Sequence, residues 1–578
     1  MKKPGEYNEL FRSLGSEWKW LLGYISRYKL HIAVYVIMGI VAAAMGLGVS
    51  VSSKYLIDAV LDKNVHTIVT SAAAAVFLGL AQIVINAVIS RVAAMAGTKI
   101  SSEIRENIYE HIVFSKWESV RRYHSGDLLN RIEGDAGAVA SSIVTFIPGV
   151  FTKLTQFVGC LALVLYYDPT MAIFAFLSTP FLALSSRITA KMTRKYNKES
   201  REMNGKLISF YSESIQNLQM IKAFDITSRY VEQIRRNLAL YRKIRLDHDK
   251  FATIMTACMA VIGLIVSYAC YGWGVWRLWN GIISFGTMTL FLQISGKLTA
   301  SFSSLVSLAP SAISIATAAG RIMEITQMPL ENGGDADKAA RMSDSVRKNG
   351  VTIECENLTY TYDDGTEPVV KDVSFIARAG ETIAFVGPSG EGKTTVLRLI
   401  LGLLEPDSGS IIMRTDDGEA IKASESTRRF CSYVPQENAV FSGCIADNLR
   451  IVCPEASDDD LKCVLEAADA WSFIERLPLG IYTPVDEKGV NFSEGQIQRI
   501  SIARALLRDA AVIVMDEATS ALDAATEERV LANMMKAYPN RTRIITTHRP
   551  SMLRYCTRIY RISTDGTLTQ VSAEEAAG

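Results

Sequence analysis

Long apolar runs dominate the chain from about residue 30 to residue 325, and polar stretches separate them. Each run is long enough to cross about 30 Å of hydrocarbon as a helix that rises about 1.5 Å per residue. The pattern therefore predicts an α-helical membrane domain. We place its six spans near residues 30–52, 67–93, 137–167, 170–190, 251–279 and 284–318.

The segment before the first span carries aromatic residues at short intervals: Trp18, Trp20, Tyr24 and Tyr28. Trp and Tyr side chains favour the headgroup level of a membrane, where one end of the ring meets water. The first span also begins too far into the chain for a cleaved signal peptide. We therefore predict an N-terminal helix that lies in the membrane surface.

Two long connections, residues 94–136 and 191–250, are polar but keep a helical period. They are predicted to extend the transmembrane helices into the cytosol. Lys and Arg are concentrated in 191–250, and the short loops near Asp62, Asp168 and Ile283 carry almost none. Because cationic loops stay on the cytoplasmic side, both chain termini are predicted to be cytoplasmic.

The second half of the chain has a different pattern. A polar, glycine-containing stretch at 328–350 interrupts the apolar runs, as linkers do. Beyond it, short β-branched runs alternate with helical segments, which is typical of parallel strands in an α/β domain. The runs lie at 382–386, 511–515 and 543–547. We divide the chain into a membrane domain (1–325), a linker (326–350) and an α/β domain (351–578).

Composition and charge exclude several classes of protein. With 61 Lys and Arg against 60 Asp and Glu, the chain lacks the basic excess that is typical of nucleic-acid binding. A hydrophobic content of 49% excludes intrinsic disorder. The nine cysteines are scattered and form no CxxC pair, so a zinc or disulfide framework is not expected.

A phosphate-binding motif lies at the start of the α/β domain. Residues Gly387 to Thr394 match G-x-x-x-x-G-K-[ST], after an apolar strand and before a helical segment, which is the context that the motif requires. In this interpretation the loop amides surround phosphate oxygens, and Lys393 binds the β- and γ-phosphates. Thr394 supplies a hydroxyl to Mg²⁺.

Two further strand ends carry chemistry. The strand at 511–515 is followed by Asp516 and Glu517, which suits a site where Asp516 binds Mg²⁺ and Glu517 polarises the attacking water. His548 follows the strand at 543–547, where its imidazole could reach a γ-phosphate. An isolated acidic pair at a strand end is more often a solvated turn or a helix start, and an isolated histidine there is usually a surface residue.

These motifs, with three further ones in fixed order, resemble the nucleotide-binding domain of an ABC transporter. The three are Tyr362, Gln436 in VPQENAVFSG, and FSEGQIQRISIARAL; the acidic pair lies in VMDEATSALD and His548 in TTHR. Six spans with cytosolic extensions before such a domain resemble an exporter-type half-transporter, so the expected fold is a six-helix membrane domain followed by an α/β P-loop ATPase domain.

The resemblance implies a role for each matching residue. Glu517, His548 and Lys393 are expected to act in catalysis, and Thr394, Gln436 and Asp516 to bind Mg²⁺. The ATP-binding residues are expected to be Tyr362, which stacks on adenine, with Gly387, Pro388, Ser389, Gly390, Glu391, Gly392, Lys393, Thr394, Thr395, Gln436, Ser493, Gly495, Gln496 and Asp523.

The same resemblance implies contacts with other parts of the assembly. Ser493 and Gly495 are expected to meet ATP bound by a second half-transporter, and Ser520 to Asp523 to lie at the subunit interface. Glu487 resembles an acidic residue that touches the coupling helices. Those helices are expected near Lys116–Tyr123 and Asn217–Phe224.

One position departs from the family pattern. The usual LSGGQ signature stands here as Phe492-Ser493-Glu494-Gly495-Gln496, and a carboxylate at the third position adds negative charge near the phosphate. In heterodimeric members, a chain with an intact catalytic glutamate often carries the altered signature. A homodimer and a heterodimer both remain open.

The sixth span carries polar residues three or four positions apart on one face, which suits a water-filled cavity. Lys297 has no Asp or Glu in a span to pair with, and Lys153 in the third span has the same problem. We hypothesise that they face the translocation pathway and favour anionic or strongly polar substrates; snorkelling to the membrane surface is the alternative. The candidate cavity residues are Lys153, Gln293, Lys297, Ser301 and Ser304.

Together these features predict an ATP-driven subunit that exports a small molecule, lipid or peptide through the inner (plasma) membrane, with ATP and Mg²⁺ as cofactors. Its expected partners are a second half-transporter, the lipid bilayer and an unidentified substrate, and the half-sized chain suggests a bacterial source. An importer on the same fold is the first alternative, and a nucleotide-gated channel or regulator is the second.

Overall fold

A computed structural model describes residues 4–170, 192, 195–196, 199–200, 202–363, 365–388, 390–436, 440–486, 489, 491–547 and 549–577. The chain forms two compact units. The helical unit contains residues 1–112 and 124–327, and the α/β unit contains residues 113–123 and 328–578. The short segment 113–123 thus belongs with the second half of the chain.

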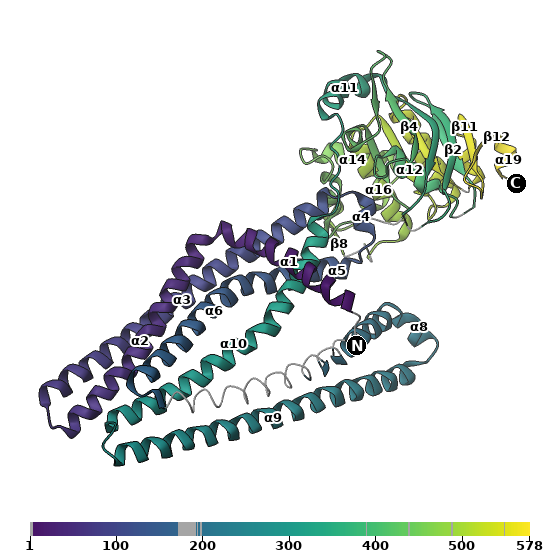
Figure 1. Ribbon diagram of the computed structural model, residues 1–578. Coiled ribbons are helices and arrows are strands. Elements are labelled where there is room, and N and C mark those ends of the chain that lie inside the picture. Colours follow the sequence, from purple (N-terminus) through teal and green to yellow (C-terminus); the bar gives the residue numbers. More distant parts are fainter. Residues whose placement is uncertain are drawn as a thin grey trace. The chain divides into compact units, whose positions relative to one another are not determined.

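Long helices make up the helical unit (Figure 1). Short elements connect them: α5 (Ser125–Asn130), a π-helix (Arg131–Asp135) and α8 (Leu218–Ala223). The long helices are α1 (Pro4–Arg27), α2 (Lys29–Leu61), α3 (Val65–Phe114), α6 (Ala136–Tyr167), α9 (Thr227–Trp279) and α10 (Phe285–Thr326).

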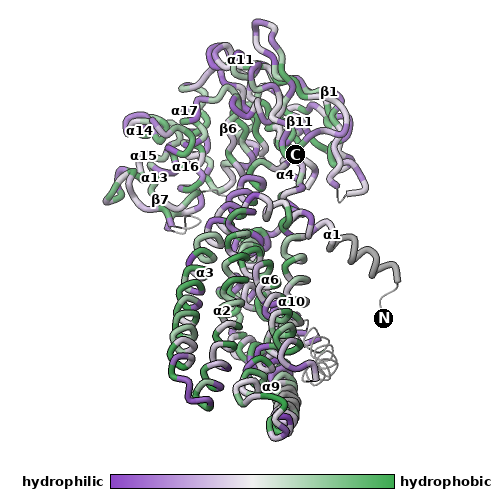
Figure 2. Tube along the Cα trace, turned by 60° about the vertical axis from the view of Figure 1, so that its left-hand side comes forward, coloured by the Kyte–Doolittle hydropathy of each residue, from purple (hydrophilic) through white to green (hydrophobic). Residues whose placement is uncertain are grey.

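Three helical stretches in the described part of the chain are long and apolar enough to cross a membrane: Lys29–Leu61, Val65–Phe114 and Ser125–Tyr167. Figure 2 shows apolar residues along most of α2, α3 and α6. Large side chains such as Phe77 and Ile83 are exposed, as expected for helices that face lipid.

Three further spans were predicted after the one at 137–167. The predicted span at 170–190 lies almost wholly outside the described residues. Helix α9 contains the span predicted at 251–279, and α10, which begins at Phe285, contains all but the first residue of the span predicted at 284–318. The aromatic N-terminal segment is helical, as predicted, in α1. The connection 94–136 is mostly helical, and α8 and α9 cover the later part of 191–250.

Residues from α2, α6 and α10 pack together within the helical unit. One buried cluster contains Cys160 and Val164 of α6 with Leu290, Ile294 and Leu298 of α10. Gly39 of α2 faces Thr152 of α6, and Gly159 of α6 faces Leu47 of α2, with no room for a Cβ at either glycine. Such close approach at small residues is typical of helix pairs in membranes.

The α/β unit is built on two sheets. An antiparallel sheet has the strand order β2-β1-β4-β5, and a six-stranded sheet has the order β12-β11-β3-β10-β9-β6, parallel except for β12. The first contains β1 (Thr352–Tyr360), β2 (Val370–Ala377), β4 (Ser408–Arg414) and β5 (Ala420–Lys422). The second contains β3 (Thr382–Val386), β6 (Cys431–Val434), β9 (Val512–Asp516), β10 (Thr542–Thr546), β11 (Arg558–Ile562) and β12 (Leu568–Val571).

The three predicted parallel strands are confirmed. Every residue of β3, β9 and β10 is buried, which explains why these strands appear as continuous apolar or β-branched runs instead of alternating ones. The carboxyl ends of parallel strands meet at one edge of a sheet. The residues that follow β3 and β9 are therefore brought together there.

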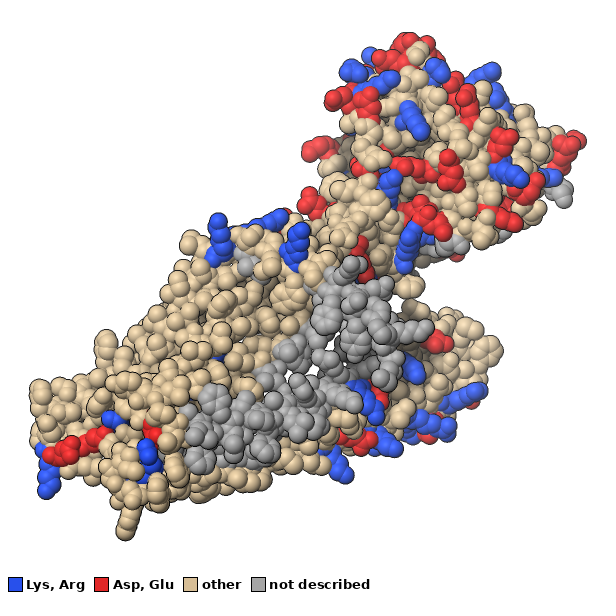
Figure 3. Space-filling model, in the orientation of Figure 1, with Lys and Arg blue, Asp and Glu red and all other residues tan. Residues whose placement is uncertain are grey.

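Helices complete the α/β unit, with a short hairpin of β7 (Gly443–Cys444) and β8 (Pro484–Val485) and two 3₁₀ turns, Glu425–Phe430 and Gly480–Tyr482. Figure 3 shows acidic and basic side chains spread over this unit, whereas much of the helical unit's visible surface is uncharged. The helices are α4 (Trp117–Arg121), α11 (Ala336–Asn349), α12 (Lys393–Ile400), α13 (Ile445–Arg450), α14 (Asp458–Ala467), α15 (Trp471–Ile474), α16 (Glu494–Leu507), α17 (Ala524–Ala537), α18 (Pro550–Leu553) and α19 (Ala573–Ala577).

Helix α11 lies within the stretch predicted to be a linker. Its buried residues Ala339, Met342 and Val346 recur at helical spacing and join the core of the α/β unit. Asp335 caps its first turn by accepting a hydrogen bond from the Lys338 amide at 2.9 Å. An amphipathic helix therefore attaches much of this polar stretch to the α/β unit.

Candidate nucleotide-binding site

The predicted phosphate-binding loop connects β3 to α12, as its motif requires. Gly387, Gly390 and Gly392 have φ angles of 140°, 92° and 90°, values that side chains with a Cβ rarely adopt. The loop backbone can therefore turn tightly before α12 begins at Lys393. The amino end of α12 then directs main-chain N–H groups and the positive end of the helix dipole toward an anion.

The side chain of Lys393, the first residue of α12, points back into this loop. Its Nζ donates hydrogen bonds to the carbonyl oxygens of Gly387 and Pro388, both at 2.7 Å. Burial lowers the pKa of Lys393, and the negative charges of Glu517, Glu391 and Asp516 act in the opposite direction. A buried ammonium at the amino end of a helix suits a phosphate group, so the residues of this loop fit a nucleotide. Ser389 lies outside the described residues.

The acidic pair after β9 is held by threonine and glutamine side chains. The Thr546 hydroxyl donates to Asp516 Oδ1 at 2.7 Å and accepts from the Glu517 amide at 2.9 Å. Gln436 Nε2 donates to Glu517 Oε2 at 2.9 Å. Glu517 has a φ of 47°, which is uncommon for a residue with a Cβ. Residues in such strained backbone conformations are often found at functional sites. The structure thus brings together Gln436 and Glu517, while His548 lies outside the described residues.

Tyr362 is held in place from several sides. Its hydroxyl lies 3.1 Å from Thr395 Oγ1 and accepts from Arg398 Nη1 at 3.3 Å, so it is tied to α12. Tyr360 meets its ring edge-on, with centroids 5.0 Å apart. The guanidinium of Arg121, on α4, lies 4.7 Å from the centre of the Tyr362 ring. The ring that is expected to stack on adenine is therefore held by contacts from β1, α4 and α12.

The signature motif begins α16. Ser493 is the N-cap residue, and its hydroxyl accepts from the Gln496 amide at 3.3 Å while the Gln496 side chain accepts from the Ser493 amide at 2.8 Å. Glu494 is exposed in the first helical turn, where the helix dipole favours a carboxylate. In this chain, Ser493 and Gln496 therefore bond each other across the first turn of α16.

The segment Ser520–Asp523 is held by two side chains that the sequence analysis missed. Gln498 donates to Ser520 Oγ and accepts from the Ala521 amide, both at 3.0 Å. Arg549 donates to the carbonyl oxygens of Ser520 and Leu522. Asp523 then caps α17 by accepting from the Thr526 amide at 2.9 Å. Gln498 lies within the motif FSEGQIQRISIARAL, and Arg549 directly follows His548, so both residues lay in motifs that the sequence singled out without giving either residue a role.

The candidate cavity residues lie on α6 and α10. Lys297 Nζ donates to the Gly46 carbonyl oxygen at 2.6 Å and to Ser50 Oγ at 2.7 Å, both on α2. Ser301 is buried and bonds the carbonyl oxygen of its own helix at Lys297. Ser304 and Lys153 are half-buried, and Gln293 is exposed.

Short helices occupy the positions expected for coupling helices. Helix α4 lies within 116–123 and α8 lies within 217–224. Glu487, the acidic residue expected to meet such helices, lies outside the described residues.

The fold and the site define a class of protein: a P-loop ATPase unit fused to a membrane-spanning helical unit. Two family models match the chain, "ABC transporter transmembrane region" over residues 32–302 and "ABC transporter" over residues 370–520. The chain belongs to the ABC transporters whose transmembrane region and ATPase domain are fused in one polypeptide. It is an ATPase subunit of a membrane transporter, as the sequence motifs predicted.

Relatives and a solved structure agree with this assignment. The chain is 24% identical to a multidrug resistance ABC transporter ATP-binding and permease protein of Lactococcus lactis, over 92% of this chain and 88% of that protein. It is 29% identical to the uncharacterized ABC transporter ATP-binding protein YfiC of Bacillus subtilis, over 79% and 74%. Its fold is similar to that of a bacterial Atm1-family ABC exporter with ATP bound, with a TM-score of 0.77, 20% identity and coverage of 95% and 96%.

Proposed function

We propose that this chain is one half of a dimeric exporter that moves a substrate out of a bacterial cytoplasm at the expense of ATP. The hydrogen bond from Gln436 to Glu517, a carboxylate whose charge acts on Lys393 of the phosphate-binding loop, supports the proposal, because a carboxylate held at this site could polarise the attacking water. The relative from Lactococcus, named for multidrug resistance, supports export as the direction.

The residues of this chain would divide the work of hydrolysis as follows. Lys393 and the loop amides would bind phosphates, and Tyr362 would stack on the adenine ring. Thr394, Gln436 and Asp516 offer the hydroxyl, amide and carboxylate oxygens that suit Mg²⁺, which would supply charge neutralisation. Glu517 would accept a proton from the attacking water, and His548 would contact the γ-phosphate.

A second copy or a related chain would complete each ATP site. Ser493, Gly495 and Gln496 of one chain would face the nucleotide held by the other, with Asp523 at the interface. Glu494 in the signature motif is compatible with both a homodimer and a heterodimer. The native mass and ATPase activity of the chain expressed alone distinguish them. A dimer that hydrolyses ATP unaided supports a homodimer, and an inactive chain supports a missing partner.

The proposed orientation places both termini and the α/β unit in the cytoplasm. It rests on the Lys- and Arg-rich connection 191–250. Everted membrane vesicles test orientation and direction together, since their outer surface is the cytoplasmic face. We expect ATP added outside to drive dye into these vesicles, and the Glu517→Gln variant to accumulate none. Uptake by intact cells would contradict export, and dye flux without hydrolysis would indicate a channel.

We also propose that Lys297 favours substrates with an anionic group. The two acceptors that the structure gives its ammonium, a carbonyl and a hydroxyl, are both neutral, so its charge stays uncompensated by them. The cost of such a charge within a membrane span is at least about 2.5 kcal/mol, which an anionic ligand would offset.

The preference can be measured with two dyes in everted vesicles. We expect Lys297→Gln to lower transport of the anionic dye calcein about tenfold, equivalent to about 1.4 kcal/mol, and to spare the cationic dye Hoechst 33342. Lys63→Gln, which removes an exposed lysine from the turn between α2 and α3, serves as the control. Equal losses for both dyes would contradict a charge preference.

A further inference from the structure

A strap of residues, Pro329–Gly334, joins the segment 113–123 within the α/β unit. The Lys116 amide donates to the Pro329 carbonyl oxygen at 2.9 Å, and the Glu331 amide donates to the Phe114 carbonyl oxygen at 2.9 Å. Ser115 and Leu330 form an antiparallel bridge between these two bonds. Because main-chain bonds connect them at both ends of this bridge, the strap and the segment are expected to move together.

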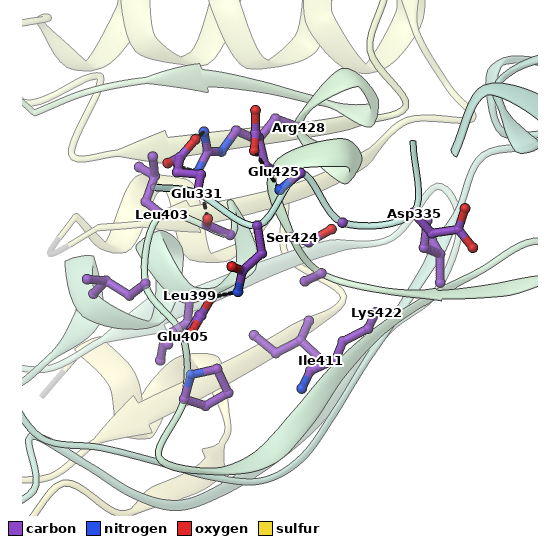
Figure 4. Close-up of a pocket in the computed structure, with 18 of the residues that line it drawn as sticks. Glu331, Asp335, Leu399, Leu403, Glu405, Ile411, Lys422, Ser424, Glu425 and Arg428 are labelled. Atoms are coloured by element: carbon purple, nitrogen blue, oxygen red, sulfur yellow. Dashed lines mark hydrogen bonds and ion pairs between the residues drawn. The ribbon is translucent and has the colours of Figure 1, made fainter. Parts of the chain in front are cut away.

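A half-buried ion pair ties the strap to the rest of the unit, beside hydrogen bonds from the Gly333 amide to Glu425 Oε2 at 3.0 Å and from Asn332 Nδ2 to Glu405 Oε1 at 3.4 Å. The Glu331 carboxylate accepts from Arg428 Nη1 at 2.8 Å and from Arg428 Nη2 at 2.7 Å, with only 15% and 27% of the two side chains exposed. Such two-pronged pairs are the strongest and most directional ion pairs in proteins. Figure 4 shows the two side chains facing each other beside Leu403.

Arg428 also holds the carboxyl end of α12. It donates to the carbonyl oxygens of Leu401 at 3.2 Å and Gly402 at 2.7 Å, groups that a helix end leaves without intrahelical partners. Gly402 has a φ of 62°, and a Cβ there would lie 2.6 Å from the main-chain carbon of Ser424. Only glycine allows this close approach, which keeps both carbonyl groups within reach of Arg428.

Helix α12 is therefore connected at both ends. At its amino end are Lys393 and the phosphate-binding loop, and at its carboxyl end is the Arg428 guanidinium. The helix has eight residues and a length of about 12 Å, so it moves as a rigid body. A shift imposed by phosphates at one end is therefore expected to reach Arg428 through its bonds to the Leu401 and Gly402 carbonyls.

A cavity beside the ion pair gives the strap room to move. It has a volume of about 480 Å³ and is lined by the strap, by residues that follow α12 and by Ile411, Lys422 and Ser424. In Figure 4, Ile411 and Lys422 lie across this space from Glu331. A movement of the strap therefore need not displace a packed core.

We propose that Arg428 and Glu331 form a latch that transmits displacement of α12 on nucleotide binding to the strap and the segment 113–123. Both are positioning residues, since neither lies in the phosphate-binding loop or the acidic pair. The latch rests on the proposed function, because it needs ATP to bind at the amino end of α12.

Hydrogen exchange at the two connecting amides, Lys116 and Glu331, tests the latch in the full-length dimer. The parent carries Glu517→Gln to retain Mg-ATP, which is the probe. We expect ATP to change exchange of both amides at least about threefold in the parent, and by less than about 1.5-fold with Glu331→Gln or Arg428→Gln. Binding of a fluorescent ATP analogue should stay within about twofold, or about 0.4 kcal/mol.

Glu405→Gln is the matched control. It removes the ion pair from Lys116 to Glu405 at 2.8 Å, and it alters the acceptor of Asn332 Nδ2 on the strap, at 3.4 Å, while the pair of Glu331 and Arg428 stays in place. It therefore tests whether the loss of any contact of the strap and the segment is enough to block the response. If the latch has a purely structural role, Glu331→Gln and Arg428→Gln should lower the unfolding temperature but keep the change in exchange on ATP binding. Glu405→Gln is expected to keep that change in exchange. If Arg428→Gln fails to fold, Glu331→Gln decides alone, because it keeps Arg428 bonded to α12.

Failure of the latch and failure of the proposed ATP site give different results in this experiment. A parent that binds ATP and responds, with latch variants that respond equally, overturns the latch and leaves the ATP site intact. A parent whose ATP binding is no stronger than that of Lys393→Ala overturns the proposed function itself, and the latch with it.

Discussion

Replacing Glu517 with glutamine is expected to reduce steady-state ATP hydrolysis by about 10²–10⁴-fold, the usual contribution of a positioned general base. Glutamine has nearly the same shape and can still accept the hydrogen bond from Gln436 Nε2, which is 2.9 Å from the carboxylate. It cannot accept a proton from water. The loss should therefore lie in the chemical step, with ATP binding retained.

Two measurements on the same sample separate these steps. Phosphate release gives the turnover rate, and retention of labelled ATP on a filter gives the bound nucleotide. Glu475→Gln makes the same chemical change at an exposed position after α15 and should hydrolyse ATP at the parental rate. Ordinary hydrolysis by the Glu517→Gln protein would show that another group acts as base.

The sequence predicted the phosphate-binding loop and acidic pair because each motif is a short strand followed directly by its functional residues. Local spacing then fixes their geometry. It could not predict the contacts of Gln436 with Glu517, which are 81 residues apart, or of Arg121 with Tyr362. Those contacts depend on which strands and helices become neighbours in the folded unit.

Helix α11 and the contacts of Lys297 could not be predicted from the sequence for two different reasons. Helix α11 escaped prediction because its overall polarity masked an apolar spacing of three and four residues at Ala339, Met342 and Val346. Lys297 lacked an acidic partner in the sequence because its acceptors include a main-chain carbonyl, at Gly46. Every residue has such a group, so residue types alone cannot show which one a lysine will find.

The ion pair between Asp168 and Arg277 connects the end of α6 to α9 within the helical unit. Asp168 ends α6 and is 1% exposed; its Oδ2 accepts from Arg277 Nε at 3.1 Å and from Nη2 at 2.7 Å. Its Oδ1 accepts from the Thr170 amide and hydroxyl at 2.9 Å and 2.7 Å. Trp273 of α9 donates to the same hydroxyl at 3.2 Å, so α6 and α9 share one network.

We expect Asp168→Ala to lower the free energy of unfolding by about 3–5 kcal/mol, because it leaves the Arg277 guanidinium partly buried without its carboxylate. Unfolding in mixed micelles, titrated with dodecyl sulfate and followed by Trp fluorescence, measures the change. Glu232→Ala breaks an exposed pair with Arg236, at 3.2 Å on the surface of α9, and should cost less than about 1 kcal/mol.

The double variant Asp168→Ala/Arg277→Met distinguishes an unpaired charge from lost packing. Removing both charges takes away the desolvation cost of the isolated guanidinium, so the double variant should be more stable than Asp168→Ala alone. Additive losses from the two substitutions would show that each side chain stabilises the unit through its own packing. The gain in stability on adding Arg277→Met therefore measures how strongly the membrane-spanning helices depend on charge neutralisation at this end of α6.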